Sequence, residues 1–115
     1  MKIDIVKDIK GIIINAEVAH DDYCGICNVE MVHAFDWYDQ IEYISSNCVI
    51  DNGVLKTDSL QLENGIYILC CISDKNGEVI LGSKPQEGFV IQKAFCIGNS
   101  SELADASIRD IYSGV

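Results

Sequence analysis

Residues 51–77, DNGVLKTDSLQLENGIYILCCISDKNG, contain the dipeptide Asn-Gly at 52–53, 64–65 and 76–77, each twelve residues after the one before. Both central residues of a type I′ turn need positive φ, which Asn and Gly tolerate, so Asn-Gly between apolar runs indicates a hairpin. The equal spacing predicts an antiparallel meander. Its middle strand is IYILCCI, residues 66–72, which is apolar throughout and is typical of a strand covered on both faces.

The flanking sequence predicts further strands. Near the N-terminus Ile3 and Ile5, and then Ile12, Ile14 and the residues that follow, alternate as strand residues do, which indicates a hairpin. Counting this hairpin, we expect five to seven strands in one sheet. The meander strands are expected at about 46–50, 54–62, 66–73, 78–82 and 89–97.

Two segments have the apolar spacing of amphipathic helices, at about 29–44 after Asn28 as N-cap and at about 101–112 after a serine cap. The predicted fold class is therefore α+β, with an antiparallel β-meander sheet packed against the two helices. At 115 residues the chain is expected to form a single domain, 1–115.

The formal net charge is −10, and the segment from Gly11 to Leu55 contains no lysine or arginine but eight carboxylates. Such a field repels phosphates, which argues against direct binding to nucleic acid or to an anionic membrane and favours a basic protein partner. Acidity can also serve solubility alone. The N-terminal residues lack the apolar run of a secretory signal, so a cytoplasmic protein is expected.

The favoured function is a small acidic binding protein that occludes a basic surface, as an inhibitor or immunity protein of a nucleic-acid enzyme does. Asp36, Asp39 and Glu42 would lie on the polar face of the first helix, with Tyr43 as an aromatic anchor. Asp21 and Asp22 extend the acidic surface before that helix. With one arginine and no phosphate loop or nucleophile elbow, the sequence favours a binding protein over an enzyme.

The chain has six cysteines, of which Cys24 and Cys27 have polar neighbours, whereas the other four lie in apolar runs. A C-x-x-C pair supplies two ligands for tetrahedral zinc, and the two histidines of the chain, His20 and His33, flank the pair. The alternatives are a zinc site made of these four residues, a redox pair, and cysteines without chemistry. No cofactor other than this zinc is expected.

The redox alternative depends on the order strand, Cys-Gly-Ile-Cys, helix, because a helix N-terminus favours the thiolate. Residues 11–27, GIIINAEVAHDDYCGIC, resemble the strand and Trp-Cys-Gly-Pro-Cys corner of thioredoxins, and residues 68–81, ILCCISDKNGEVIL, resemble their later hairpin. The resemblance implies a thiol-disulfide oxidoreductase with Cys24 as nucleophile and Cys27 as resolving thiol. The cis-proline of thioredoxins has no counterpart, since the single proline is Pro85.

Overall fold

The computed structural model describes residues 2–9, 11–34, 39–84 and 91–98, and the described residues form an all-β fold. Each strand pairs with its neighbours in the antiparallel sense. The strands are β1 (Ile3–Asp8), β2 (Gly11–Glu17), β3 (Tyr23–Ala34), β4 (Asp39–Asp51), β5 (Val54–Thr57), β6 (Gly65–Asp74), β7 (Val79–Gly82) and β8 (Lys93–Ile97).

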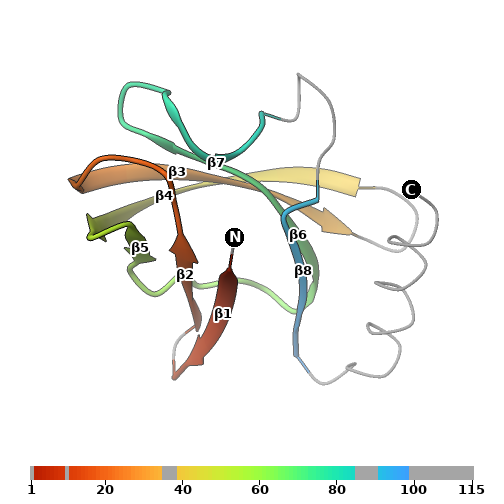
Figure 1. Ribbon diagram of the computed structural model, residues 1–115. Coiled ribbons are helices and arrows are strands. Elements are labelled where there is room, and N and C mark those ends of the chain that lie inside the picture. The colour runs from red at the N-terminus through yellow and green to blue at the C-terminus, as the bar shows by residue number, and fades with distance from the viewer. Residues whose placement is uncertain (1, 10, 35–38, 85–90, 99–115) are drawn as a thin grey trace.

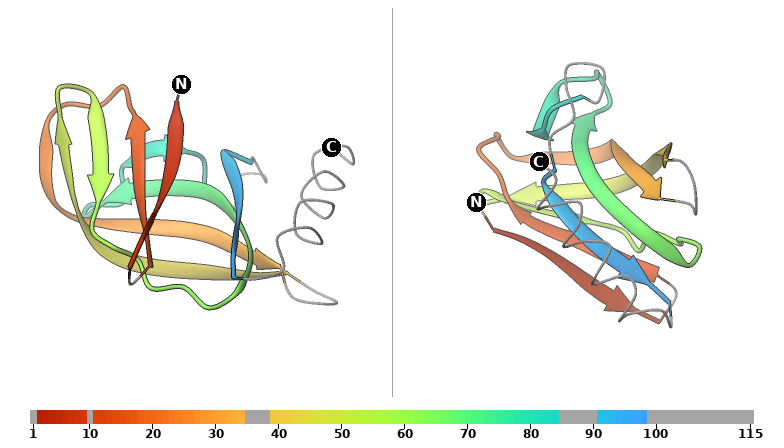
Figure 2. Two further views of the ribbon diagram at one scale, coloured as in Figure 1. Left: turned by 90° about the horizontal axis from the view of Figure 1, so that it is seen from below. Right: turned by 90° about the vertical axis from the view of Figure 1, so that its right-hand side faces the viewer.

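All eight strands belong to one sheet, in the order β1-β2-β5-β4-β3-β6-β7, with β8 also paired to β6. One edge of β6 pairs with β3. The other edge pairs with β8 along its first half and with β7 along its second half. The sheet curls into an open half-barrel, with the β1–β2 hairpin on one flank and β8 on the other (Figure 1, Figure 2). The tip of the β1–β2 hairpin and the end of β8 line one pocket of about 260 Å³.

The predicted class α+β is wrong, because the described residues contain strands and no helix. Residues 29–34 belong to β3 and residues 39–44 to β4, and the two strands pair along their whole length. The helix expected at 29–44 therefore does not form in its described part. The apolar spacing was misleading because β3 is buried on both faces, and a run of consecutive buried residues fits a helix as well as a strand. The helix expected at 101–112 lies outside the described residues.

Two of the three Asn-Gly pairs make the hairpin turns that the sequence predicts. Asn52 and Gly53 have φ of 54° and 79° and join β4 to β5, and Gly77, with φ of 82°, lies in the turn between β6 and β7. At Asn64-Gly65 the prediction is wrong, because β5 and β6 are not neighbours. The segment between them instead forms a bridge between Leu60 and Ile12. The sheet is thus no simple meander.

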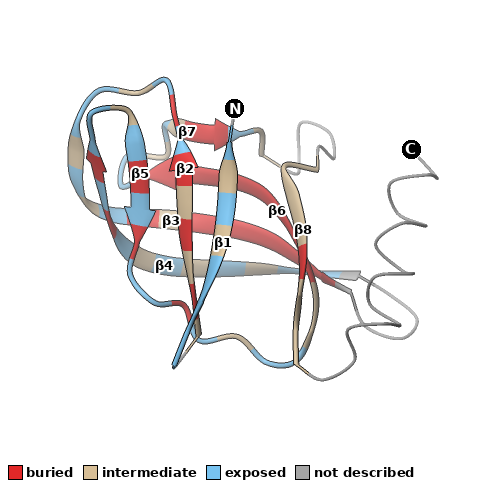
Figure 3. Ribbon diagram, turned by 60° about the horizontal axis from the view of Figure 1, so that its bottom comes forward, coloured by how far each residue is buried: buried red, intermediate tan, exposed pale blue. Residues whose placement is uncertain are grey.

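The main core fills the inside of the curl, where β2, β3, β5 and β6 contribute apolar side chains (Figure 3). A second, smaller cluster on the opposite face of the sheet contains Val32, Ile68, Cys70 and Cys71. A β-bulge explains why both cysteines lie there. The register between β3 and β6 shifts between Glu30 and Met31, and Cys70 is the extra residue on β6. The alternation of side chains between the two faces of β6 therefore changes at this point.

Candidate functional site

One end of the half-barrel gathers loops from distant parts of the sequence. The β2–β3 loop and the β4–β5 turn meet there, because the backbone N–H of Val18 donates to the carbonyl oxygen of Gly53 over 2.8 Å. In addition, the N–H of Asn52 donates to Oδ1 of Asp22 over 3.1 Å. We call the segments 17–22, 51–53 and 74–78 together the acidic end.

The β6–β7 turn completes the acidic end. Its residue Lys75 donates its backbone N–H to the hydroxyl oxygen of Tyr23 over 3.4 Å, which ties the turn to the start of β3. Asp74 is only 5% exposed, and its Oδ1 accepts the backbone N–H groups of Asn76 at 2.8 Å and Glu78 at 3.0 Å. A carboxylate therefore holds the turn that the Asn-Gly pair initiates.

The charge of this end is strongly negative. One lysine, Lys75, lies within the three segments, against six carboxylates. Four of the six belong to the lysine-free stretch that the sequence singled out, and two come from the β6–β7 hairpin. The six are Glu17, Asp21, Asp22, Asp51, Asp74 and Glu78.

A pocket of about 400 Å³ opens at the acidic end, lined by Val18, Ala19, His20, Asp21 and Glu78. Nδ1 of His20 lies 3.0 Å from the carbonyl oxygen of Asp21. Ligand atoms of His20, Asp74 and Glu78 lie within 4.8 Å of one another. Nitrogen and carboxylate donors thus meet beside an open pocket, which is a donor set that divalent metals accept.

The structure does not bring together the four residues of the zinc site expected from the sequence. His20 lies in the β2–β3 loop, whereas Cys24, Cys27 and His33 lie on β3. Nine residues of strand separate Cys24 from His33, roughly 30 Å at about 3.3 Å per residue, whereas zinc ligands must all lie about 2 Å from one ion. Of the four, only His20 contributes to the metal-ligand group found among the described residues.

Cys24 and Cys27 also differ from a thioredoxin pair in their surroundings. Both lie within a strand, Cys24 exposed and Cys27 fully buried, and the described part of the chain places no helix N-terminus beside them to favour a thiolate. Burial, and then the neighbouring Cys48, raise the pKa of the Cys27 thiol from 9.0 to about 12. Cys27 is therefore protonated and a weak nucleophile at neutral pH.

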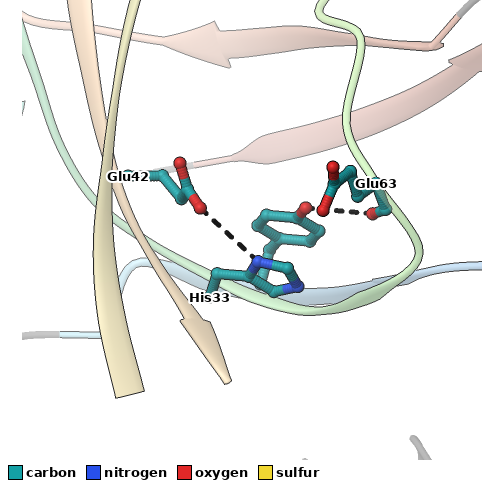
Figure 4. Close-up of polar contacts among 4 residues, drawn as sticks. His33, Glu42 and Glu63 are labelled. Atoms are coloured by element: carbon teal, nitrogen blue, oxygen red, sulfur yellow. Dashed lines mark hydrogen bonds and ion pairs between the residues drawn. The ribbon is translucent and has the colours of Figure 1, made fainter. Parts of the chain in front are cut away.

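The opposite end of β3 holds a second polar group, centred on the buried side chain of His33 (Figure 4). The His33 ring stacks on Tyr67 with ring centroids 4.3 Å apart, and its Nδ1 lies 3.5 Å from Oε1 of Glu42. The Tyr67 hydroxyl donates to the carbonyl oxygen of Glu63 over 2.9 Å. Burial, and then the carboxylates of Glu42 and Glu63, raise the pKa of Tyr67 to about 12. The aromatic stack continues to Phe95, so this end is packed.

The residues expected to bind a partner are divided between these places. Asp21 and Asp22 lie exposed at the acidic end, whereas Glu42 lies beside His33 at the other end of the sheet. Tyr43 is 59% exposed, but it is eight residues along β4 from Asp51. Asp36 and the side chain of Asp39 lie outside the described residues. The acidic surface centred on a helix is therefore replaced by a smaller surface at the loops.

Sequence reasoning missed Asp74 and Glu78, the two acidic residues of the β6–β7 hairpin. Asp74 stands two residues before an Asn-Gly pair, which is a sequence signal for a turn-stabilising side chain. Its approach to His20 depends on where β6 lies in the sheet, since β2 and β6 are separated by three strands in the sheet order. The curl of the sheet therefore brings Asp74 close to His20.

No protein-family model, no curated protein and no solved structure matches this chain. The part of the chain that the structure describes holds no helix with the length and apolar character needed to cross a membrane.

Proposed function

We propose that this protein is a small acidic binding protein whose acidic end contacts a basic surface on a partner protein. The observation that carries the proposal is the convergence of three loops that place six carboxylates at one end of the half-barrel, against Lys75 of the loops and Lys84, whose Nζ lies near Gly77. The partner would be an enzyme that binds nucleic acid, because such enzymes present basic grooves.

Electrostatics supports contact with a basic partner in particular. Asp21, Asp22 and Asp51 are exposed, and they lie in or beside loops held by backbone hydrogen bonds. A concentrated negative field on a fixed surface steers a basic partner toward it and orients the encounter. The same field repels phosphate backbones, so nucleic acid would not bind this protein. It would instead compete with this protein for the basic groove of the partner.

Inhibition by occlusion is the mechanism that follows. The carboxylates of the acidic end would occupy positions in the partner's groove that phosphates normally take, each facing a lysine or arginine of the partner. The hydrogen bonds that hold the loops to one another limit the conformational entropy lost on binding. No bond is made or broken in this mechanism.

The test compares two variants with the same change in net charge. Asp21→Asn, Asp22→Asn and Asp51→Asn together remove three charges from the acidic end, and the amides preserve shape and the acceptor that Asp22 offers to Asn52. The control variant removes three charges elsewhere: Asp4→Asn, Asp58→Asn and Glu63→Gln. Binding to a panel of purified basic nucleases and polymerases is measured by surface plasmon resonance, and their activity is assayed in parallel.

We expect at least one member of the panel to bind and to be inhibited at low ionic strength. The acidic-end variant should weaken binding at least tenfold, and the control variant by less than threefold, since three charges contribute about 0.5 kcal/mol each at a charged interface. Binding should weaken as ionic strength rises from about 0.01 M to 0.15 M, which shortens the Debye length from about 30 to 8 Å. Equal effects of the two variants, or no binding to any basic enzyme at low salt, would contradict the proposal.

A further inference from the structure

We infer that His20, Asp74 and Glu78 form a binding site for a divalent transition metal, zinc being the metal that fits best. His20 comes from the β2–β3 loop and the two carboxylates from the β6–β7 hairpin, which is distant in the sequence, and the ligand atoms of the three lie within 4.8 Å of one another. One imidazole and two carboxylates make a three-residue protein ligand set of the kind that zinc accepts when a water fills the fourth position. The inference does not depend on the proposed partner contact.

The state of Asp74 is the strongest reason to place a cation here. Asp74 is only 5% exposed, and no lysine or arginine of the described residues forms an ion pair with it. Its Oδ1 accepts hydrogen bonds from the backbone N–H groups of Asn76 and Glu78. A buried acidic residue without an ion-pair partner, beside two other metal-ligand groups, is stabilised by a bound cation.

The two backbone N–H groups on Oδ1 also serve as outer-sphere contacts. Metal-ligating carboxylates are normally hydrogen-bonded, which fixes their orientation and limits the entropy lost when the metal binds. The N–H bonds to Asp74 would persist with the metal in place, because a carboxylate has a second oxygen to offer. The β6–β7 turn is therefore already arranged for Asp74 to act as a ligand.

His20 has the arrangement that is common among metal-bound histidines. Its Nδ1 is 3.0 Å from the carbonyl oxygen of Asp21, and a carbonyl oxygen can only accept a hydrogen bond. The proton of the neutral ring is therefore on Nδ1, and Nε2 carries the lone pair that a metal requires. A carbonyl or carboxylate behind a ligating imidazole is the usual second contact at metal sites.

The geometry needs a small closure to hold the ion. With bonds of about 2.0 to 2.1 Å, two ligand atoms on tetrahedral zinc lie about 3.3 Å apart. The spacing of up to 4.8 Å thus shortens by rotation of Glu78, which is exposed, and His20, which is half-buried in a loop. The adjoining pocket of about 400 Å³, lined by both residues, leaves space for a water as the fourth ligand. Magnesium and calcium fit less well because they prefer ligand sets made of oxygen alone.

The experiment titrates the whole, reduced protein with ZnCl₂ in a calorimeter, and repeats the titration with MgCl₂. We expect one zinc ion per chain and weaker or no binding of magnesium. His20→Ala, Asp74→Asn and Glu78→Gln should each weaken zinc binding at least tenfold. Circular dichroism checks that each variant is folded, and Asp74→Asn retains an acceptor for the two backbone N–H groups.

Two controls separate this site from general charge and from thiols. Asp51→Asn removes one charge from the acidic end without removing a ligand, so it should change zinc affinity less than threefold. Cys24→Ser removes the exposed thiol of β3 and should leave zinc affinity unchanged. Substituted cobalt should give a visible spectrum without the sulfur-to-cobalt charge-transfer band, because the ligands are nitrogen and oxygen.

Several outcomes would overturn the inference. They are the absence of zinc binding, binding that Asp51→Asn weakens as much as Glu78→Gln does, and a thiolate band in the cobalt spectrum that Cys24→Ser removes. A failure of the partner assay with intact zinc binding would reject the proposed function and leave the metal site standing. The reverse result would reject the metal site alone.

Discussion

The two histidines of this chain each lie near carboxylates, but their surroundings are opposite. His33 is 3% exposed, stacks on Tyr67 and lies at the packed end of β3. His20 lies half-buried in a loop, with one ring nitrogen on a backbone carbonyl and two carboxylates beside an open pocket. The comparison separates a histidine that is part of the core from one that is available to a ligand.

The difference arises from the elements that carry each residue. His33 stands on β3 between β4 and β6, and its ring is stacked on Tyr67, so only 3% of the residue is exposed. His20 stands on the connection between β2 and β3, which must leave the sheet to reach a distant strand. Loops are where binding groups are usually found on a rigid scaffold, and the binding groups proposed for the acidic end lie on loops.

Replacing each histidine by alanine tests this contrast, and it is expected to give the largest effect on the free energy of unfolding. We expect His33→Ala to lower the free energy of unfolding by about 3 kcal/mol, because it removes a buried ring from an aromatic stack and leaves a cavity. His20→Ala should change it by less than about 0.5 kcal/mol in metal-free buffer, as is usual for loop side chains. Urea denaturation followed by circular dichroism measures both. Similar costs for the two would break the comparison.

A smaller effect is expected at Gly65, where β6 begins beside His33. Its φ is 151°, and a Cβ added there would collide with Nε2 of the His33 ring. Gly65→Ala should therefore lower the free energy of unfolding by about 2 kcal/mol, from backbone strain and overpacking together.

The double variant sharpens that prediction. In the His33→Ala background the collision is gone, and Gly65→Ala should cost only about 1 kcal/mol, which gives a coupling of about 1 kcal/mol in a double-mutant cycle. Strict additivity of the two substitutions would show that the His33 ring does not confine Gly65.

A further effect is expected at alkaline pH, because burial disfavours the ionised forms of Cys27 and Tyr67. The pKa of Cys27 is raised from 9.0 to about 12 and that of Tyr67 from 10.0 to about 12, mainly by burial. Raised pKa values mean that the folded state favours the protonated forms. The stability that these groups contribute is therefore complete below their ordinary pKa values and is lost as pH rises from about 9 toward 12.

Urea denaturation at a series of pH values from about 8 to about 11 tests this loss. Tyr67→Phe cannot ionise at that position, so its free energy of unfolding should decrease less over the same range. An ultraviolet titration should also show one of the five tyrosines ionising late in the parent protein and missing from Tyr67→Phe. A parallel decrease in parent and variant would contradict the role assigned to Tyr67.

Part of the fold could be predicted from local signals. The hairpins at Asn52-Gly53 and Asn76-Gly77, and the opening hairpin of alternating isoleucines, form where the sequence indicates them. These features depend on residues close in the chain, whose preferred φ values and alternation act locally. The strand IYILCCI is buried as its apolar character predicts, although a bulge places Cys70 and Cys71 on the same face.

The helix at 29–44 was the main error, and its cause is physical. Val29, Met31 and Val32 are all buried because β3 has a core on each side, so the period of two that marks a strand is hidden. The pairing of β3 with β4 and β6 outweighs helix propensity there. For the same reason Glu42 lies on strand β4 and not on the acidic face of a helix.

By itself the sequence determined the excess of negative charge, the absence of cationic residues between Gly11 and Leu55, and two tight turns, because these are properties of composition and of neighbouring residues. Only the tertiary structure decided which carboxylates share a surface and which histidine is open to a ligand. The order of strands in the curled sheet brings Asp74 and Glu78 to His20, and this order is set by long-range pairing and burial, which no local pattern encodes.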